Sequence, residues 1–560
     1  MTVAACAPGN LGSGSQSGQP SSSSSGPKTI VIGIDEDVAS IWDVVTSGGG
    51  TGARELANIV NQHLVALTAD GSPTPRLLAE IPSLERGTWT VQPDGGMETT
   101  WKLRPNVVWH DGTPFTAEDV LFSYAVNRDS EIPNANQETV RLISRMDAVD
   151  PTTVKVTWSE PYPFADRLEH RDLFPVPKHL LERSYSDAKE AFLLQPYFSD
   201  EYVGLGPYRV TRWERGSHLD LTAFDQFFLG RPRIDTIRVQ FITDMSTMLA
   251  NLSSRATQMM LTLGAVPKFD SLMNLKREWE SSRYGTVLTD PITYRFIEPQ
   301  KRSTASPADL ADPRVRQALM YMLDREELIR VNFGEDGILA DSWAHPQFPQ
   351  YSQLRDAIFR YAPDTRRASA LLEEAGWQRG PNGLEKGGQH FQVAIRDADG
   401  EHDALILASS WKAVGINGTY EPRSTALLRD RQDRATFTGI EITSSPLALL
   451  SVSRKLAGIN IPTADNRWTG SNRGAYSNPI WDDLDKRANT TLHERDRIDI
   501  ERDLVRIYTT ELPLLPLYFR MDAVPVGGGI TGPVANTGVA HRGFILHTWN
   551  ISDWDVPTRG

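Results

Sequence analysis

One pair of residues in this chain has a spacing that could serve nucleophilic chemistry. Ser186 and Lys189 match the Ser-x-x-Lys pattern, in which a lysine can activate a serine for acyl transfer. The Ser-Asp-Asn and Lys-Thr-Gly segments that complete such a site are missing from the sequence. We therefore interpret the pair as part of a solvated helix.

Other catalytic and metal-binding motifs are also missing. The sequence has no Gly-x-x-x-x-Gly-Lys phosphate loop, no His-Glu-x-x-His motif and no Gly-x-Ser-x-Gly turn. The 11 histidines are dispersed, and a single cysteine excludes a site built from several thiolates. We expect neither an enzyme nor a bound metal or cofactor.

His110, Asp111 and Gly112 invite a catalytic interpretation, but a structural one fits them better. Asp-Gly pairs are typical of tight turns. A histidine beside such a turn can satisfy nearby backbone groups. We therefore predict a turn that is held in part by the His110 side chain.

The elements around this turn are readable from the sequence. Thr99, Trp101 and Leu103 alternate with polar neighbours, as on a half-buried strand. Thr116 and Asp119 have the spacing of a capping box, which predicts the start of an amphipathic helix. A strand, a tight turn and a helix start therefore follow one another here.

Length and charge limit the class of protein. A chain of 560 residues is too long for one hydrophobic core, so two or three domains are expected. The formal charge of −13 argues against a nucleic-acid partner, because such binding needs a basic face. No uninterrupted apolar run approaches the roughly 18 residues of a membrane-spanning helix.

The N-terminal region predicts a membrane anchor and a tether. Val3-Ala-Ala-Cys6 resembles a bacterial lipobox, in which the cysteine receives lipid. Residues 9–27 contain 8 Ser and 5 Gly, a composition too polar to form a packed core. We expect Cys6 to be lipidated and residues 1–27 to be a disordered tether. The alternative is a disordered tail with an incidental cysteine.

Strand and helix patterns mix along the rest of the chain without a strict βαβ rhythm, which predicts an α/β fold with mixed sheets. Strands are predicted at 28–34, 154–158 and 237–241. Helices are predicted around 54–63, after Asp312-Pro313, after Asp324 and at 368–375.

Several segments, in the correct order, resemble signatures of the solute-binding proteins of peptide-type ABC importers (solute-binding family 5, the dipeptide and oligopeptide binders). The segments are 103–120, 204–208, 228–232, 312–325, 371–377, 414–416 and 476–479. Leu205 replaces the threonine of the family's Gly-Thr-Gly-Pro-Tyr. The resemblance spans about residues 28–520.

This resemblance implies a two-lobed, periplasmic-binding-protein-like fold of type II, in its large three-domain form, with mixed sheets and a hinge. The first lobe would combine a discontinuous domain of residues 28–60, 204–295 and 515–560 with an extra domain of residues 61–203. Residues 296–514 would form the second lobe. The solute would be enclosed between the lobes.

The resemblance also implies site residues. Ser47, Gly50 and Thr51 lie in a glycine-rich loop whose backbone N–H groups could approach a carboxylate or carbonyl; the alternative is a mere connector. Tyr294 lies where related chains enter the second lobe, so a hinge or wall position is expected.

The strand at 437–445 departs from the family. Peptide binders carry there an aspartate that pairs with the α-amino group of the peptide, whereas this chain has Thr443, Ser444 and Ser445. Glu441 shares a strand face with Thr443 and could receive a cation instead. Alternatively Glu441 sits in a surface salt bridge, or the solute lacks a free amine.

A polar, aromatic loop before the 476–479 segment completes the expected site. Arg467 could clamp a carboxylate, and Trp468 or Tyr476 could stack on a sugar or a side chain. The alternative is a solvated rim.

Together these residues predict the solute-binding component of an ABC importer, which closes on a peptide or similar oligomeric solute and delivers it to the membrane permease. The expected partners are that solute, the permease and ATPase complex, and the membrane through the lipid anchor. We expect a monomer outside the cytoplasm, periplasmic or at the cell surface. The alternatives are an oligosaccharide-binding member of the same family and a secreted cell-wall hydrolase.

Overall fold

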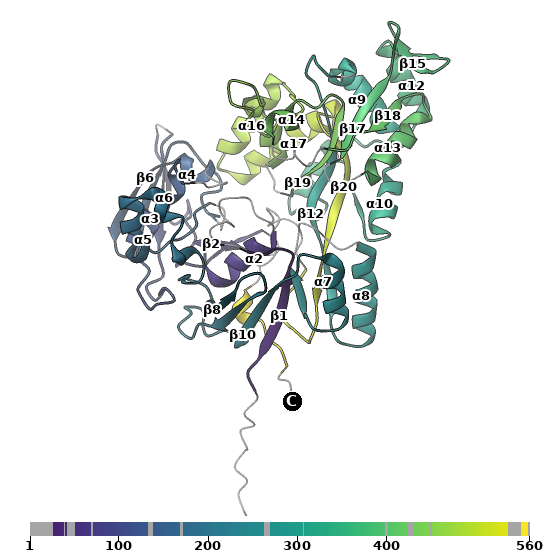
Figure 1. Ribbon diagram of the computed structural model, residues 1–560. Coiled ribbons are helices and arrows are strands. Elements are labelled where there is room, and N and C mark those ends of the chain that lie inside the picture. The colour runs from purple at the N-terminus through teal and green to yellow at the C-terminus, as the bar shows by residue number, and fades with distance from the viewer. Residues whose placement is uncertain are drawn as a thin grey trace, which may run out of the picture.

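The computed structural model describes residues 26–557, except 39, 42–50, 69–70, 94, 133–137, 169–171, 262–268, 306, 398–400, 424–426, 428–429, 448–450 and 536–549. Within these residues, an 11-stranded sheet runs through the molecule. Its order is β18 (Asn417–Tyr420), β17 (Gln392–Asp397), β19 (Ile440–Pro446), β12 (Thr286–Pro299), β20 (Leu515–Val526), β11 (Met259–Leu261), β1 (Thr29–Ile34), β10 (Thr236–Phe241), β9 (His218–Ala223) and β8 (Tyr208–Glu214), and β13 (Ile338–Leu339) also pairs with β20. Figure 1 shows two lobes with β12 and β20 running between them, so the predicted two-lobed α/β fold is confirmed.

The first lobe contains the β1 end of the sheet. β1 lies parallel between β10 and β11, and β9 pairs antiparallel with β8 and β10. Ile30, Ile32 and Ile34 of β1 are buried in the core of this lobe, as the apolar run predicts. The helices drawn beside this end of the sheet are α2 (Thr51–Val60), α7 (Met245–Ser253) and α8 (Phe269–Ser281).

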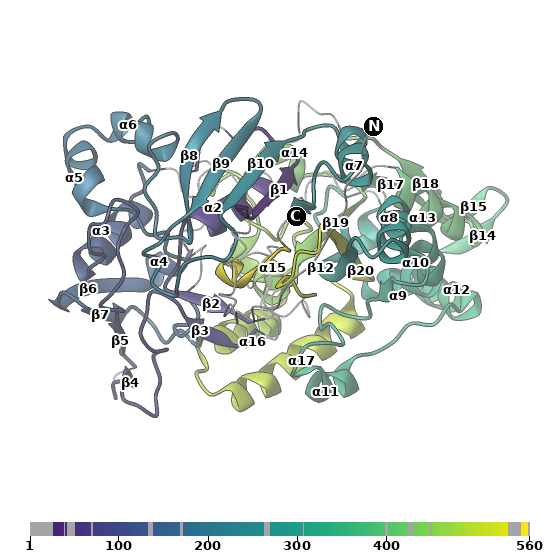
Figure 2. The ribbon, with the colours of Figure 1, turned by 90° about the horizontal axis from the view of Figure 1, so that it is seen from below.

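A smaller body, built around a second, four-stranded sheet, lies beside this lobe (Figures 1 and 2). Its sheet has the order β4 (Trp89–Val91), β5 (Met97–Lys102), β7 (Thr153–Trp158) and β6 (Ile143–Asp150). Val154, Val156 and Trp158 alternate inward into its core, as predicted. Its other elements are β2 (Val65–Leu67), β3 (Pro73–Pro75), α3 (Ala117–Arg128), α4 (Glu138–Leu142), α5 (Lys178–Asp187) and α6 (Lys189–Phe192).

The structural interpretation of His110 is confirmed. One ring nitrogen accepts the Gly204 N–H at 3.1 Å, and the other lies 3.0 Å from the Gly206 carbonyl oxygen. Asp111 shapes the turn by accepting the Thr113 N–H at 2.9 Å. The turn after β5 and the Gly-Leu-Gly-Pro-Tyr segment are therefore fastened to each other.

The two glycines of that segment are required by close packing against α2. A Cβ atom on Gly204 would lie 2.1 Å from the Val60 carbonyl oxygen, and one on Gly206 would lie 2.3 Å from the Val60 carbonyl carbon. The Gly206 N–H donates to Val60, and the Leu205 N–H donates to the Asn61 side chain. These contacts end α2 at Val60, three residues before the predicted end at 63.

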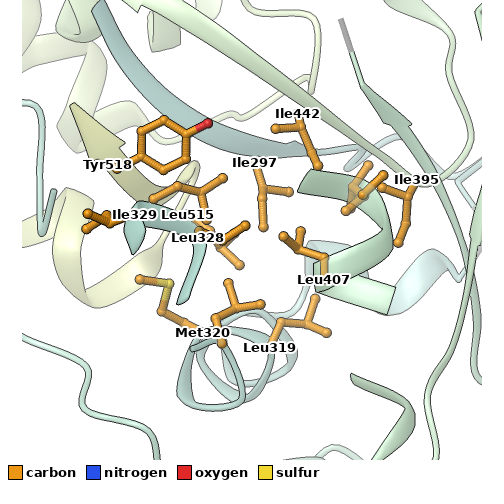
Figure 3. Close-up of a cluster of buried hydrophobic side chains, with 14 of the residues drawn as sticks. Ile297, Leu319, Met320, Leu328, Ile329, Ile395, Leu407, Ile442, Leu515 and Tyr518 are labelled. Atoms are coloured by element: carbon orange, nitrogen blue, oxygen red, sulfur yellow. The ribbon is translucent and has the colours of Figure 1, made fainter. Parts of the chain in front are cut away.

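The second lobe covers its part of the sheet on both faces. On one face, Ile297, Ile395 and Ile442 pack against helices α9 (Pro313–Tyr321), α10 (Arg325–Phe333) and α13 (His402–Lys412) (Figure 3). The opposite face carries a separate cluster that includes Phe296 and Trp481. The elements of this lobe are α9 (Pro313–Tyr321), α10 (Arg325–Phe333), α11 (Tyr351–Leu354), α12 (Thr365–Glu374), α13 (His402–Lys412), α14 (Arg431–Ala435), α15 (Ser451–Leu456), α16 (Pro479–Thr490), α17 (Glu494–Glu511), β14 (Gln378–Gly380), β15 (Gly383–Lys386) and β16 (Gln389–His390).

The two long strands β12 and β20 connect the lobes. They pair antiparallel along their length, with a bulge between Pro291 and Thr293. In the second lobe β12 also pairs with β19, whereas β20 reaches β11 of the first lobe through Val526. Leu515 packs in the core of the second lobe and Val526 in the core of the first, so the two ends of β20 belong to different hydrophobic cores. The domain boundaries given above stay predictions.

No helix in the described part of the chain combines the length and the apolar character that a bilayer crossing needs.

Candidate solute-binding site

Three of the predicted residues lie outside the described residues. These are Cys6, Ser47 and Gly50. Thr51 is the first residue of α2, but its side chain is not among those described. Their roles stay predictions.

Tyr294 lies on β12 close to the bulge, inside the core of the second lobe. Its side chain has no exposed surface, and its hydroxyl lies 2.5 Å from the hydroxyl of Tyr508. Its ring packs beside Phe296 and Phe519. Tyr294 therefore occupies the connecting strand, with its side chain closed off from solvent.

Glu441 lies in a buried cluster of charges. Its carboxylate is 3.5 Å from Arg423 and 4.0 Å from Arg473, and the side chain is 2% exposed. Glu298, opposite it on β12, pairs with Lys455 at 3.0 Å. Burial raises the pKa of Glu441, and the nearby Glu298 raises it further, whereas Arg423 opposes this shift.

This arrangement matches the ion-pair interpretation of Glu441 more closely than the solute-binding one, although the ion pair is buried rather than at the surface. The predicted strand faces are as expected: Ile440 and Ile442 join one core, and Glu441 faces the other way. A solute cation would have to compete with two guanidinium groups of the protein. A role for Glu441 in binding solute stays a prediction.

The serines and threonine that replace the family aspartate follow on β19 towards the bulge. Thr443 and Ser444 are half-buried and Ser445 is buried. Ser444 pairs in register with Arg295, and its buried hydroxyl has no hydrogen-bond partner in the described structure. These residues add no carboxylate to the site.

The three predicted residues in the loop between α15 and α16 differ in their exposure to solvent. Arg467 is exposed and Trp468 half-buried, and both have positive φ angles, 56° and 59°. Tyr476 is instead buried, and its hydroxyl donates to Glu511 at 2.7 Å. Arg473 of the same loop pairs with Glu441. Of the three predicted residues in this loop, only Arg467 and Trp468 keep side-chain surface that a solute could contact.

A groove that the sequence does not reveal lies between the small body of the first lobe and the second lobe. Its volume is about 550 Å³, within the range of small-molecule sites. One wall carries Arg141, Leu142 and Glu160, and the other is built by α15, α16 and the turn between them. The lining residues of this second wall are Arg454, Ala457, Ile459, Asn460, Asp482, Asp485, Lys486, Asn489 and Thr490.

Each wall of the groove carries charged side chains of both signs. Among the described residues, neither Glu160 of the first lobe nor Lys486 of the second forms an ion pair. Asp482 is already used, because it accepts the Gly458 N–H at 2.7 Å. No sequence pattern joins Glu160 to Lys486, because they are common surface residue types on segments that meet only after folding.

The connecting strands carry a pair of buried carboxyl groups. Asp290 of β12 and Asp522 of β20 are directly opposite each other and are 2% and 1% exposed. Burial raises the pKa of Asp522 to about 7, an effect that Arg520 opposes and Asp35 strengthens. The described residues contain no group of three or more His, Cys, Asp or Glu side chains suited to a metal ion.

Two lobes joined by paired strands, with a groove between them, define a solute-binding protein of the two-lobed class. The sequence matches the family described as bacterial extracellular solute-binding proteins, family 5 (middle region), over residues 79–440. The chain belongs to this family.

Curated relatives include the oligopeptide-binding protein AppA of Bacillus subtilis, 25% identical over 333 residues, which cover 58% of this chain and 58% of AppA. The dipeptide-binding protein of Escherichia coli is 27% identical over 362 residues, 61% of this chain and 63% of that protein. The matched regions therefore span less than two thirds of these relatives.

Solved structures share the fold. An oligopeptide-binding protein of Thermus thermophilus, complexed with a pentapeptide, has a TM-score of 0.72 at 22% identity, covering 94% of this chain and 96% of that one. NikA of Brucella suis, in complex with Fe(III)-EDTA, has a TM-score of 0.74 at 18% identity, covering 94% and 100%. One fold therefore encloses chemically different solutes, so the fold alone does not name the solute.

Proposed function

We propose that this protein is the solute-binding component of an ABC importer and that it captures a peptide or similar oligomeric solute between its lobes. The observation that carries the proposal is the groove of about 550 Å³ lined from both lobes, in a chain of solute-binding family 5. The protein releases its solute unaltered to a membrane permease, whose ATPase subunits supply the energy. It acts outside the cytoplasm as a monomer held by lipid on Cys6.

The charges on the groove walls favour a peptide with free termini. Glu160 would receive an ammonium group and Lys486 a carboxylate, and each comes from a different lobe. Ile459, 89% exposed on the groove wall, offers an apolar surface to a side chain. A solute bound in this way touches both lobes, so it stabilises their closed arrangement.

An oligosaccharide is the second candidate solute. Thr443, Ser444 and Ser445 stand where peptide binders have an aspartate, and Glu441 is engaged with Arg423 and Arg473. Such a site lacks the carboxylate that an α-amino group uses in those relatives, whereas hydroxyl groups suit a sugar.

A thermal-unfolding screen of the purified full chain against free peptides, end-blocked peptides and oligosaccharides tests these proposals. A bound solute at 100 times its Kd should add about 2.7 kcal/mol to the free energy of unfolding. We expect free peptides to give this stabilisation. If no compound of these classes does so, or if mass spectrometry finds them cleaved, the proposed function is wrong.

Two variants test the groove within the same screen. Glu160→Gln and Lys486→Gln should each raise the Kd of free peptides about threefold, because a partly exposed ion pair contributes roughly 0.2–1 kcal/mol. Neither variant should change the Kd of end-blocked peptides. Lys412→Gln is the matched control, since Lys412 is exposed on α13 and does not line the groove. Equal losses for free and blocked peptides would contradict the charge assignment.

A further inference from the structure

The small body of the first lobe and the second lobe exchange apolar side chains. Phe164, in the loop after β7, is half-buried and packs against the core cluster of the second lobe that contains Trp481 and Tyr508. Leu492, in the turn between α16 and α17, packs in return against the core cluster of the small body. Each lobe therefore covers apolar surface of the other.

The Phe164 ring is also held between two guanidinium groups, one from each lobe. Arg497 of α17 lies 5.2 Å from the ring centroid, and Arg167 of the first lobe lies 5.6 Å from it. These distances are within the range of attractive cation–π contacts, which strengthen when water is excluded. The Arg497 side chain is 5% exposed, so its contact is largely desolvated.

Both guanidinium groups are also held by contacts within their own lobe. Arg167 forms two hydrogen bonds with Asp166, at 2.9 and 3.2 Å. Arg497 donates to the Thr491 and Leu492 carbonyl oxygens and lies 3.7 Å from Glu501. These contacts do not involve the other lobe, so they can persist when the lobes separate and reduce the ordering that closure requires.

Charges at this contact also attract across the lobes. Glu494 of the second lobe attracts Arg167 of the first, and Asp166 of the first lobe attracts Arg497 of the second, whereas the Arg167 and Arg497 guanidinium groups repel each other. The contact thus combines apolar burial, cation–π contacts and complementary charges. The structure places it beside the groove, because Thr490 lines the groove two residues before Leu492.

We propose that Phe164 is a positioning residue that latches the two lobes together and thereby sets the closed fraction of the protein. Neither Phe164, Leu492 nor Arg497 lines the groove, so the latch acts without touching a solute held there. The apparent Kd of a solute that binds the closed form rises as the closed fraction falls. Removing the latch should therefore raise the apparent Kd of every solute by the same factor.

The test compares lobe separation in the full chain without any solute. Spin labels at Val149→Cys and Leu405→Cys, in a Cys6→Ser background, report the distance between the small body and the second lobe; both positions are exposed. Phe164→Ala should shift the distance distribution to longer values, and Phe164→Tyr, which keeps the aromatic ring, should restore the wild-type distribution. Unchanged distances in Phe164→Ala would overturn the proposal.

Leu492→Ala tests the latch from the other lobe, should Phe164→Ala fold poorly. It should lengthen the same distances, because Leu492 packs from the second lobe against the core cluster of the small body. Unchanged distances in Leu492→Ala would contradict a latch made by side chains of both lobes. Trp213→Ala is the matched control: Arg215 lies 4.2 Å from the Trp213 ring, and both residues belong to the β8–β9 hairpin of the first lobe, so distances between the small body and the second lobe should not change.

Affinity provides a second readout, which rests on the proposed function. For any solute found in the screen, Phe164→Ala should raise Kd about tenfold, mainly through faster dissociation, and by the same factor for free and blocked peptides. A loss of affinity confined to one solute class would show that Phe164 contacts the solute, and would overturn the proposed latch. The distance measurement needs no solute, so it remains decisive even if the proposed function fails.

Discussion

At the scale of single residues, the role of a charged side chain in this protein depends on its burial as much as on its residue type. Glu441 is a buried acid held by Arg423 and Arg473, whereas Glu160 and Lys486 remain available on groove walls. A buried ion pair that loses one partner leaves the other charge uncompensated, which destabilises the fold. Buried and exposed acids should therefore respond differently to substitution.

Glu441→Gln should accordingly lower the free energy of unfolding by about 1–3 kcal/mol, since two guanidinium groups lose a charged partner. The same substitution should change the Kd of amine-bearing peptides less than twofold. Denaturant unfolding and calorimetric titration measure the two effects. A tenfold loss of affinity confined to amine-bearing solutes, with stability unchanged, would instead establish Glu441 as their receptor. Asp433→Asn, within the same charged cluster, is a useful comparison.

Sequence patterns predict residues whose role is local. The turn at His110 is recognisable because Asp111 and Gly112 adjoin it, although the partners of the His110 ring, Gly204 and Gly206, lie far along the chain. Glu441 is placed on its strand face by simple alternation. Tyr476 is not recognisable as a core residue, because an aromatic ring suits both a binding surface and a core. Glu160, Lys486 and Phe164 carry no signal, since the residues that face them from the other lobe lie hundreds of positions away in the sequence.

At the scale of elements, β12 and β20 are the decisive feature. They are the strands shared by both lobes, and the bulge at Pro291 interrupts their pairing where Asp290 and Asp522 face each other. Both carboxyl groups are buried, and burial is the main cause that raises the pKa of Asp522. The connection between the lobes should therefore depend on the protonation of Asp522.

The sign of this dependence follows from the raised pKa of Asp522, about 7 in the folded state against about 3.9 when unfolded. The folded state holds the proton more tightly, so its contribution to stability is present below about pH 4 and is lost as pH rises to 7, by about 4 kcal/mol at most. Asp522→Asn should match wild type near pH 4.5 and be more stable near pH 8. Unfolding curves that differ equally at both pH values would contradict this.

At the scale of the whole molecule, the order of elements was predictable and the meeting of the lobes was not. The Asp312 cap, the buried face of α9 and the strands of the first lobe follow local periodicity, and all are confirmed. The groove and the Phe164 latch depend on how two bodies come together (Figure 2). Function in this class of fold arises at that junction, where sequence patterns are least informative.

Solution scattering on the full chain, with and without the best solute from the screen, tests most directly whether the two lobes capture an unaltered solute. The radius of gyration should fall when the solute is added, because the solute favours the closed arrangement, and mass spectrometry should recover the solute intact. A bound solute that leaves the radius of gyration unchanged, or that is recovered as fragments, would contradict capture between the lobes.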